Sequence, residues 1–247
     1  VSEVCCLIEV DSHCVLPRPV FGKSLDRPFK FRKATDDQMR ARVGRNWPIV
    51  RGEVRRMPES WTPPFDPVDV RLELSKDGGA ELLSKCEIDP TVVAVTGVTG
   101  GSSYAIEHWE NWCDSGIRSY HMKRNNAALS DGVSRMSPWI HYGMISTTRM
   151  VRDASSIGGK GAEKFLDEML VFREHAQHHV HAKDNPDDWA NIPGWAIASW
   201  NDRGPGVSEL SAIQLERGRT GDRLWDSAQT GLVRHGTMHN NVRMTWG

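Results

Sequence analysis

Apolar and polar positions change their spacing near residue 98 and divide the chain into two halves. In the first half, residues 4–10 form a short run of β-branched and small side chains, which predicts a buried strand. Residues 11–17 predict a polar turn followed by a second short strand. The second part of 21–45 has a helical pattern, and four prolines in 57–70 predict loop or extended chain.

The second half of the chain is predicted to be helical. A β-branched run at 92–98 is broken by glycines, which places a domain boundary there, and a helix is expected from Ser103. The longest helical pattern spans 162–182. Its expected apolar stripe consists of Phe165, Met169, Val171 or Phe172, Ala176 and Val180. Next to this stripe, one side of the helix is expected to carry Glu168, Phe172, His175 and His179, at i, i+4, i+7 and i+11.

Residues 215–247 predict a helix, a turn and a second helix. The first helix has an expected apolar stripe of Leu224, Ala228 and Leu232, and Ser211 with Gln214 has the spacing of a capping box for a short helix before it. Thr220 is the expected N-cap of the first helix, and Gly236 is its expected C-terminal stop. The second helix is expected to start near Met238. A helical hairpin with a polar edge is the simplest interpretation of this spacing.

Composition places few limits on function. The 247 residues carry a formal net charge of −1, so overall charge does not demand a nucleic-acid partner. No apolar run approaches the roughly 20 residues of a membrane span. The five cysteines form no C-x-x-C pair, which predicts a reducing compartment, cytoplasmic or nuclear (nucleoid in a bacterium). The chain lacks an initiator methionine, so a fragment truncated at both ends is expected.

Several motifs together resemble one known family. The segment from Leu215 reads L-E-x-G-x-T-x-D-x-L-W-x-x-A-Q and continues as G-x-M-H-x-x-x-R-M-x-W. Residues 123–126 read K-R-N-N, and residues 134–138 read S-R-M-S-P. In this order the motifs resemble the DNA photolyases and cryptochromes, most closely the class II cyclobutane pyrimidine dimer photolyases. The Asn240-Asn241 pair departs from the usual class II spelling and is similar to the class I branch.

The resemblance implies a fold and two domains. Residues 1–98 would be the C-terminal part of an α/β antenna domain with its linker. Residues 99–247 would be the N-terminal part of an all-α, FAD-binding catalytic domain. The fold class expected is therefore an α/β remnant followed by an incomplete helical domain. The chain is expected to be monomeric.

The family pattern implies a set of FAD-binding residues. Ser137 followed by Pro138 is an N-cap and N1 signature, and a helix N-terminus beside hydroxyl groups can bind an anion. The ordinary alternative is a capped helix without a ligand. The family match favours FAD contacts from Tyr120, Ser134, Arg135, Met136, Ser137 and Arg243. A second, antenna chromophore is implied, of unknown identity.

The same pattern implies a site for UV-damaged DNA. Glu168 would stay protonated in a desolvated pocket and donate to a pyrimidine carbonyl, with Phe172 packed against the lesion. Asn240, Asn241 and Met244 would lie near the lesion. Trp225 and Trp246 match the family's electron-transfer tryptophans; without the resemblance both would be core aromatics.

Two other functions are kept open. One is a cryptochrome-like photoreceptor without repair activity, which would not need Glu168, Asn240 and Met244. The other is a helical metal protein built on the histidines of 175–181, where an i, i+4 pair can chelate a metal. No H-E-x-x-H signature accompanies these histidines, and no metal site is predicted.

Overall fold

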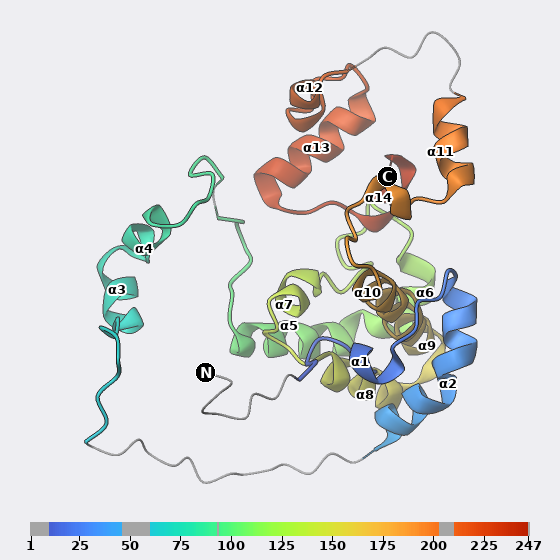
Figure 1. The fold of residues 1–247 in the computed structure, drawn as a ribbon, viewed down its shortest axis with the longest axis horizontal. Helices are drawn as coiled ribbons and strands as arrows, with labels where there is room; N and C mark the ends of the chain where they lie inside the picture. The colour runs from blue at the N-terminus through green and yellow to red at the C-terminus, as the bar shows by residue number, and fades with distance from the viewer. Residues whose placement is uncertain (1–9, 46–59, 93, 203–209, 247) are drawn as a thin grey trace. The chain divides into compact units, whose positions relative to one another are not determined.

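The computed structural model describes residues 10–45, 60–92, 94–202 and 210–246 (Figure 1). Regular structure in these residues is entirely helical, and they contain no strand. The chain divides into two compact units, one formed by residues 1–45 with 97–247 and one by residues 46–96. The predicted strand at 4–10 lies outside the described residues. The α/β remnant is therefore not seen, and the division into an antenna portion and a catalytic portion stays a prediction.

The larger unit contains most of the helices. Their bounds are α1 (Arg18–Phe21), α2 (Pro28–Gly44), α5 (Ser102–Ser115), η1 (Ile117–Ser119), α6 (Tyr120–Lys123), α7 (Ser137–His141), α8 (Thr147–Ile157), α9 (Gly159–Asp167), η2 (Glu168–Arg173), α10 (Glu174–His181), η3 (Trp189–Asn191), α11 (Gly194–Asn201), α12 (Ala212–Glu216), α13 (Arg223–His235) and α14 (Asn240–Trp246). The smaller unit contains α3 (Val70–Asp77) and α4 (Ala80–Ser84). The predicted helices in the second part of 21–45 and from residue 103 are confirmed by α2 and α5.

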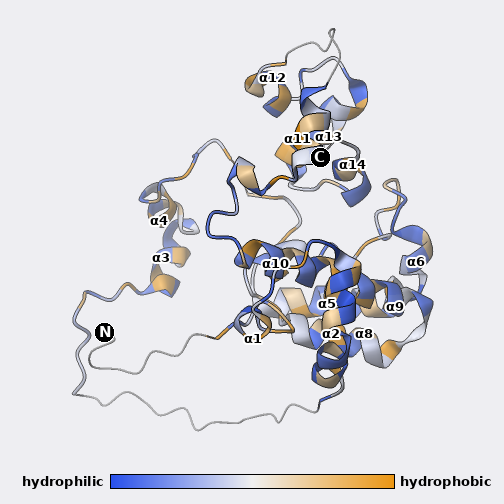
Figure 2. Ribbon diagram, turned by 45° about the vertical axis from the view of Figure 1, so that its right-hand side comes forward, coloured by the Kyte–Doolittle hydropathy of each residue, from blue (hydrophilic) through white to orange (hydrophobic). Residues whose placement is uncertain are grey.

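The core is formed by α5, α8 and α9 with one face of α2. Trp109, Met150 and Ala162 are fully buried in it. Most of α2 is hydrophilic in Figure 2, and its buried residues lie four apart on one face, at Phe31, Thr35 and Met39. Contact between α9 and η1 is very close, because a Cβ at Gly161 would lie 2.0 Å from the Ile117 carbonyl oxygen. Only glycine fits there.

The long helix predicted at 162–182 is present but not uniform. It is α-helical in α9, π-helical in η2 and α-helical again in α10. A π-helical turn holds extra backbone, so the side chains after it are rotated relative to an unbroken α-helix. The predicted stripe is correct up to Val171 and wrong beyond it: Ala176 and Val180 are exposed. Glu174 and His178 are buried in their place, because η2 turns them inward.

Residues 11–17 form no strand, contrary to the sequence prediction. The backbone N–H groups of Val15 and Leu16 donate to the Glu174 carboxylate, at 3.0 and 3.1 Å. Each of those donors therefore finds a side chain instead of a neighbouring strand. Asp11 accepts from the Arg18 backbone N–H and from the Arg18 guanidinium, at 3.0 and 2.9 Å.

The C-terminal hairpin matches its prediction in outline. Helices α13 and α14 are present, and Gly236 ends α13 at φ 63°. The predicted N-cap is wrong: Asp222 caps α13, while the Thr220 hydroxyl donates to Asp226. A carboxylate at the cap accepts two N–H groups, from Leu224 and Trp225, and this arrangement is stronger than one hydroxyl.

Candidate functional site

Glu168 is the centre of a polar site formed by α6, α9 and η2. Its Oε1 atom lies 2.8 Å from Arg124 Nη2 and 2.8 Å from Lys164 Nζ. Arg124 follows directly after α6, and Lys164 lies one turn before Glu168 on α9. One carboxylate is thus held between two cations that come from separate elements.

Aromatic rings flank both cations. The Arg124 guanidinium lies over the Tyr120 ring at 5.8 Å, and the Lys164 ammonium lies over the Phe172 ring at 5.4 Å. Both distances suit cation–π attraction. The Tyr120 ring is buried, and burial raises the pKa of Tyr120. Phe172 is 45% exposed, so its ring is open to an incoming ligand.

Helix α14 reaches the same site through one hydrogen bond. Asn241 Nδ2 donates to the Asn125 carbonyl oxygen at 2.9 Å. Two buried nitrogens lie near this bond in sequence, Arg124 Nε and His239 Nε2, and neither has a hydrogen-bond partner among the described residues. His239 Nδ1 accepts from the Asn241 backbone, so Nε2 is the donor nitrogen of that ring. Two unpaired buried donors are costly unless a ligand supplies acceptors.

The structure therefore brings Glu168, Tyr120 and Phe172 together through Arg124 and Lys164, while Asn241 bonds the residue that follows Arg124. The expected environment of Glu168 is wrong in one respect. Its side chain keeps 25% of its exposure and pairs with Arg124 and Lys164 instead of lying in a desolvated pocket. The reason is that the K-R-N segment turns its arginine back toward η2.

The other predicted residues of α14 lie apart from this ion pair. Asn240 Oδ1 accepts from Arg243 Nη2 at 2.6 Å, within the helix itself. Met244 is 65% exposed. Trp246 is the last residue of α14, and its side chain lies outside the described residues. Trp225 Nε1 donates to the Leu215 carbonyl oxygen at 3.4 Å, which links α13 to α12.

The segment predicted to bind the FAD phosphates has an unusual backbone. Arg135 has φ 53°, the one positive value outside glycine in the described residues. The predicted cap is wrong: α7 begins at Ser137, with Met136 before it and no side-chain cap bond. Met136 is 1% exposed and packs in the core, while Ser134 contacts His108 through its carbonyl oxygen. A phosphate role for Ser134 and Ser137 stays a prediction.

The histidines of α10 mainly hold residues 16–25. His175 Nε2 lies 2.7 Å from the Leu25 carbonyl oxygen, and His178 Nε2 lies 2.9 Å from that of Leu16. Among the described residues, the one cluster of metal-ligand type is Cys14, Glu174 and His178, within 4.8 Å of one another. The Glu174 carboxylate and the His178 imidazole already bind the backbone of Val15 and Leu16. The two side chains, here called the clasp, therefore hold residues 10–18 in place.

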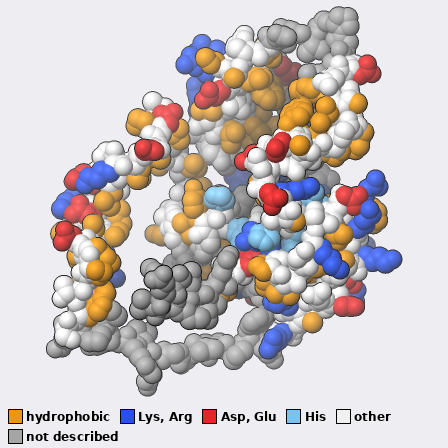
Figure 3. Space-filling model, in the orientation of Figure 1, with side chains coloured by type: hydrophobic (Ala, Val, Ile, Leu, Met, Phe, Trp, Pro, Cys, Tyr) orange, Lys and Arg blue, Asp and Glu red, His pale blue; other side chains and the backbone are white. Residues whose placement is uncertain are grey.

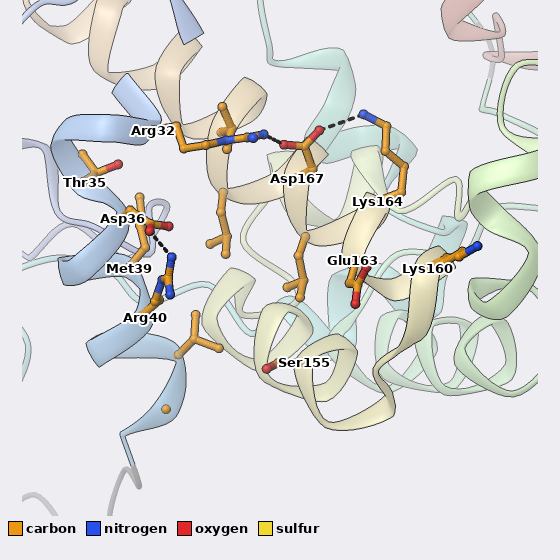
Figure 4. A pocket seen from close by; sticks show the side chains of 15 residues that line it. Arg32, Thr35, Asp36, Met39, Arg40, Ser155, Lys160, Glu163, Lys164 and Asp167 are labelled. Atoms are coloured by element: carbon orange, nitrogen blue, oxygen red, sulfur yellow. Dashed lines mark hydrogen bonds and ion pairs between the residues drawn. The ribbon is translucent and has the colours of Figure 1, made fainter. Parts of the chain in front are cut away.

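A cleft of about 840 Å³ lies between α2 and α9 (Figure 4). One ion pair crosses it, between Arg32 of α2 and Asp167 of α9, and Asp167 also accepts from Lys164 of its own helix at 2.8 Å. Arg40 pairs with Asp36 along α2. These pairs stabilise the contact of α2 with α9.

Sequence reasoning missed three residues of the Glu168 site. Arg124 belongs to the K-R-N-N segment and His239 to the G-x-M-H motif, but neither motif implied a role for these residues, and no motif included Lys164. The i, i+4 spacing of Lys164 and Glu168 was the available signal. No signal in the sequence marks His239 as lacking a partner.

The described residues form a helical domain in which two buried nitrogens near Glu168 have no hydrogen-bond partner. No family model matches the chain. It is similar to the deoxyribodipyrimidine photo-lyase of Methanothermobacter thermautotrophicus, with 32% identity over 150 residues, 60% of this chain and 33% of the relative. A deoxyribodipyrimidine photo-lyase of Oryza sativa is 32% identical over 135 residues, 53% of this chain and 27% of the relative.

A solved structure is also similar, that of a bacterial class III photolyase from Agrobacterium tumefaciens. It covers 60% of this chain and 30% of that one, at 26% identity and a TM-score of 0.49. The chain spans about a third of the length of these relatives. Both relatives carry the same name, so the chain is similar to the photolyase and cryptochrome family over somewhat more than half of its length. No helix in the described part of the chain is long and apolar enough to cross a membrane.

Proposed function

We propose that this chain is part of a light-dependent DNA repair enzyme that splits cyclobutane pyrimidine dimers with FAD, of the class II type. The observation that carries the proposal is the pairing of Glu168 with Arg124 and Lys164, next to the Asn125 carbonyl that α14 binds. Two buried donors near it have no partner among the described residues. FAD would supply the light-driven electron for ring opening. The substrate would be UV-damaged DNA with the dimer turned out of the duplex, which costs least for distorted pairs.

The free donors suit these ligands. Both Arg124 Nε and His239 Nε2 offer N–H groups, and flavin phosphates and pyrimidine carbonyls offer acceptors only. Tyr120, Ser134, Arg135, Ser137 and Arg243 would hold the flavin, with Met136 supporting them from the core. The exposed ring of Phe172, with Asn240, Asn241 and Met244, would contact the lesion.

Glu168 would act through its two cations, which it would hold beside the negative charge that develops on the pyrimidine. Its two cations fix the carboxyl group, and Arg124 itself would stabilise that charge. Removing one preorganised donor typically costs on the order of 3 kcal/mol of transition-state stabilisation. Trp225 and Trp246 would return electrons to an oxidised flavin.

The test compares Glu168→Gln, Glu168→Ala and Arg124→Lys with the parent protein. The measurements are flavin content after reconstitution and repair yield per photon on an oligonucleotide that carries one dimer. Glu168→Gln should keep flavin and lose about tenfold in yield, because a neutral amide no longer holds the Arg124 and Lys164 cations in place. Glu168→Ala should lose more and bind the damaged strand more weakly. Arg124→Lys keeps the positive charge and removes the planar guanidinium with its several N–H donors, so it should weaken both flavin binding and repair.

Glu163→Gln is a matched control, because Glu163 is an exposed carboxylate on the same long helix. It should repair like the parent. A protein that folds but takes up no flavin would contradict the proposal, as would Glu168→Ala with the parent's yield.

A further inference from the structure

Cys14, Glu174 and His178 form a buried cluster in which three kinds of metal ligand meet. Their exposed fractions are 4%, 1% and 3%, and a thiol sulfur, a carboxylate oxygen and a ring nitrogen lie within 4.8 Å of one another. Glu174 and His178 lie one turn apart on α10, whereas Cys14 comes from the segment that the clasp holds. The cluster therefore joins two parts of the chain that are far apart in sequence.

Each of the three side chains keeps one atom that can bind a cation. Glu174 Oε1 accepts two hydrogen bonds, but in the described part of the chain Oε2 accepts only the Leu16 N–H, at 3.1 Å. His178 Nε2 is the donor to the Leu16 carbonyl oxygen, because that oxygen can only accept, so the ring keeps one nitrogen with a lone pair. The free thiol of Cys14 makes no hydrogen bond to another described residue.

The segment that carries Cys14 is fixed on both sides of the thiol. Asp11 Oδ1 accepts the backbone N–H groups of His13 and Cys14, at 3.0 and 3.2 Å. The His13 carbonyl oxygen accepts from Thr147 Oγ1 at 3.2 Å and from Arg173 Nη1 at 3.1 Å. Ligands held in this way lose little conformational freedom when they bind an ion, which favours binding.

We propose that Cys14, Glu174 and His178 bind one zinc ion. Thiolate, imidazole and carboxylate are all zinc ligands, whereas Mg²⁺ and Ca²⁺ prefer oxygen atoms alone. On binding, the thiol releases its proton to solvent, and its sulfur bonds the ion. The thiolate and the carboxylate then balance the two positive charges of the ion in this buried site. The fourth tetrahedral position is left to a water molecule.

The surroundings of the cluster suit this assignment. A ring nitrogen that donates to a backbone carbonyl, as in His178, is the usual support of a zinc-binding imidazole. The Arg173 guanidinium lies 3.4 Å from Glu174 Oε1, which leaves Oε2 for the ion. Ligand atoms around tetrahedral zinc lie roughly 3–4 Å apart, so small side-chain rotations close the site.

The test uses the full chain with Cys5, Cys6 and Cys86 changed to serine, so that Cys14 and Cys113 are the remaining thiols. Titration calorimetry and metal content after dialysis measure zinc. Cobalt(II) is the spectroscopic probe, because a bond from thiolate to cobalt gives an intense charge-transfer band in the near ultraviolet. We expect one zinc per chain, a cobalt complex with that band, and a melting temperature that rises with zinc concentration.

Cys14→Ser is the decisive variant, because it removes a ligand and leaves both side chains of the clasp in place. It should lose the cobalt band, and its zinc affinity should fall by more than the roughly 10–100-fold typical of an outer-shell partner. Its melting temperature without metal should stay near that of the parent, since Glu174 and His178 still bind the backbone. His178→Gln should also lose zinc.

Two variants are matched controls. Cys113→Ser removes a partly buried thiol outside the cluster, and His175→Gln removes a histidine of α10 that bonds the Leu25 carbonyl oxygen instead. Both should keep zinc and the cobalt band, with melting curves that verify folding.

A folded parent that binds no zinc, a cobalt spectrum without the thiolate band, or parent-like affinity in Cys14→Ser would overturn the proposal. Loss of zinc in a folded control variant would place the ion elsewhere and overturn it as well. These measurements need no flavin, so their outcome is independent of the proposed function.

Discussion

The two parts of the larger unit differ in how they are held together. Every described residue that is buried lies between residues 14 and 178. From residue 184 onward, α11 to α14 contribute no buried residue among those described, and Figure 3 shows hydrophobic side chains on the faces of α11 and α13. Trp195 is 77% exposed and Leu224 is 72% exposed. The predicted stripe of Leu224, Ala228 and Leu232 is therefore present but uncovered.

The difference shows two ways in which a helix is stabilised, by local capping and by packing in a core. The later helices are specified by caps: Ser211 and Gln214 form the predicted capping box, and Asp222 caps α13. The earlier helices are specified by burial, with charged groups such as Glu174 enclosed. We expect substitutions in the earlier part to change the stability of the whole domain, and those in the later part to act locally.

The largest effect is expected from Gly161→Ala. The new methyl group would lie 2.0 Å from a backbone carbonyl oxygen, so α9 must move away from η1. Overpacking costs roughly 1–3 kcal/mol, and contact with backbone should exceed that range. Gly231→Ala in α13 is the control, since the nearest atom to a new methyl group there, the Thr237 carbonyl oxygen, is 4.0 Å away. It should gain roughly 0.5–1 kcal/mol of helix stability. Chemical denaturation measures the free energy of unfolding of both variants, and equal values would contradict the difference expected between the two parts of the unit.

The next effect concerns pH and Glu174. Burial raises its pKa from 4.5 to about 7, although the hydrogen bonds from the Val15 and Leu16 backbone lower the pKa in part. The pKa of Glu174 is higher in the folded protein than in the unfolded chain, so protonated Glu174 favours folding. Its contribution to the free energy of unfolding is fully present below pH 4.5 and is lost as pH rises toward 7. Relative to Glu174→Gln, the parent should lose up to about 1.4 kcal/mol per pH unit across that window. Denaturation curves at several pH values test this, and a constant difference would contradict it.

A smaller effect is expected from Asn241→Ala. The substitution removes the hydrogen bond from α14 to Asn125, worth about 1 kcal/mol. Faster amide exchange in α14, with an unchanged melting temperature for the rest, is the expected result. In Asn240→Ala, exchange should stay near that of the parent, because Asn240 bonds Arg243 within the same helix. Loss of global stability in Asn241→Ala would show that α14 belongs to the core.

The smallest effect is expected from Ser211→Ala. It removes the capping box of α12 and should cost about 1 kcal/mol within that helix alone. Amide exchange in α12 should rise while α5 and α9 keep their protection. A matching loss of protection in α5 would contradict a locally stabilised C-terminal part.

Local signals in the sequence were predictive, and long-range contacts were not. Serine at 211 with glutamine at 214, and glycine at 236, act within one turn and gave the correct ends of helices. Glu174 and His178 were not predicted to be buried, because their partners Val15 and Leu16 lie about 160 positions away. For the same reason, the sequence indicated Glu168 but not its pairing with Arg124.

The π-helical segment η2 has a consequence for insertions and deletions. One residue corresponds to about 100° of rotation on a helix, so an extra residue in 168–173 turns everything after it to a new direction. Deleting a single residue there would restore a regular α-helix and point Glu174 and His178 toward water. The clasp on residues 10–18 would then be lost, although no clasp residue had been changed. Relatives with a different chain length here would therefore need a different partner for that segment.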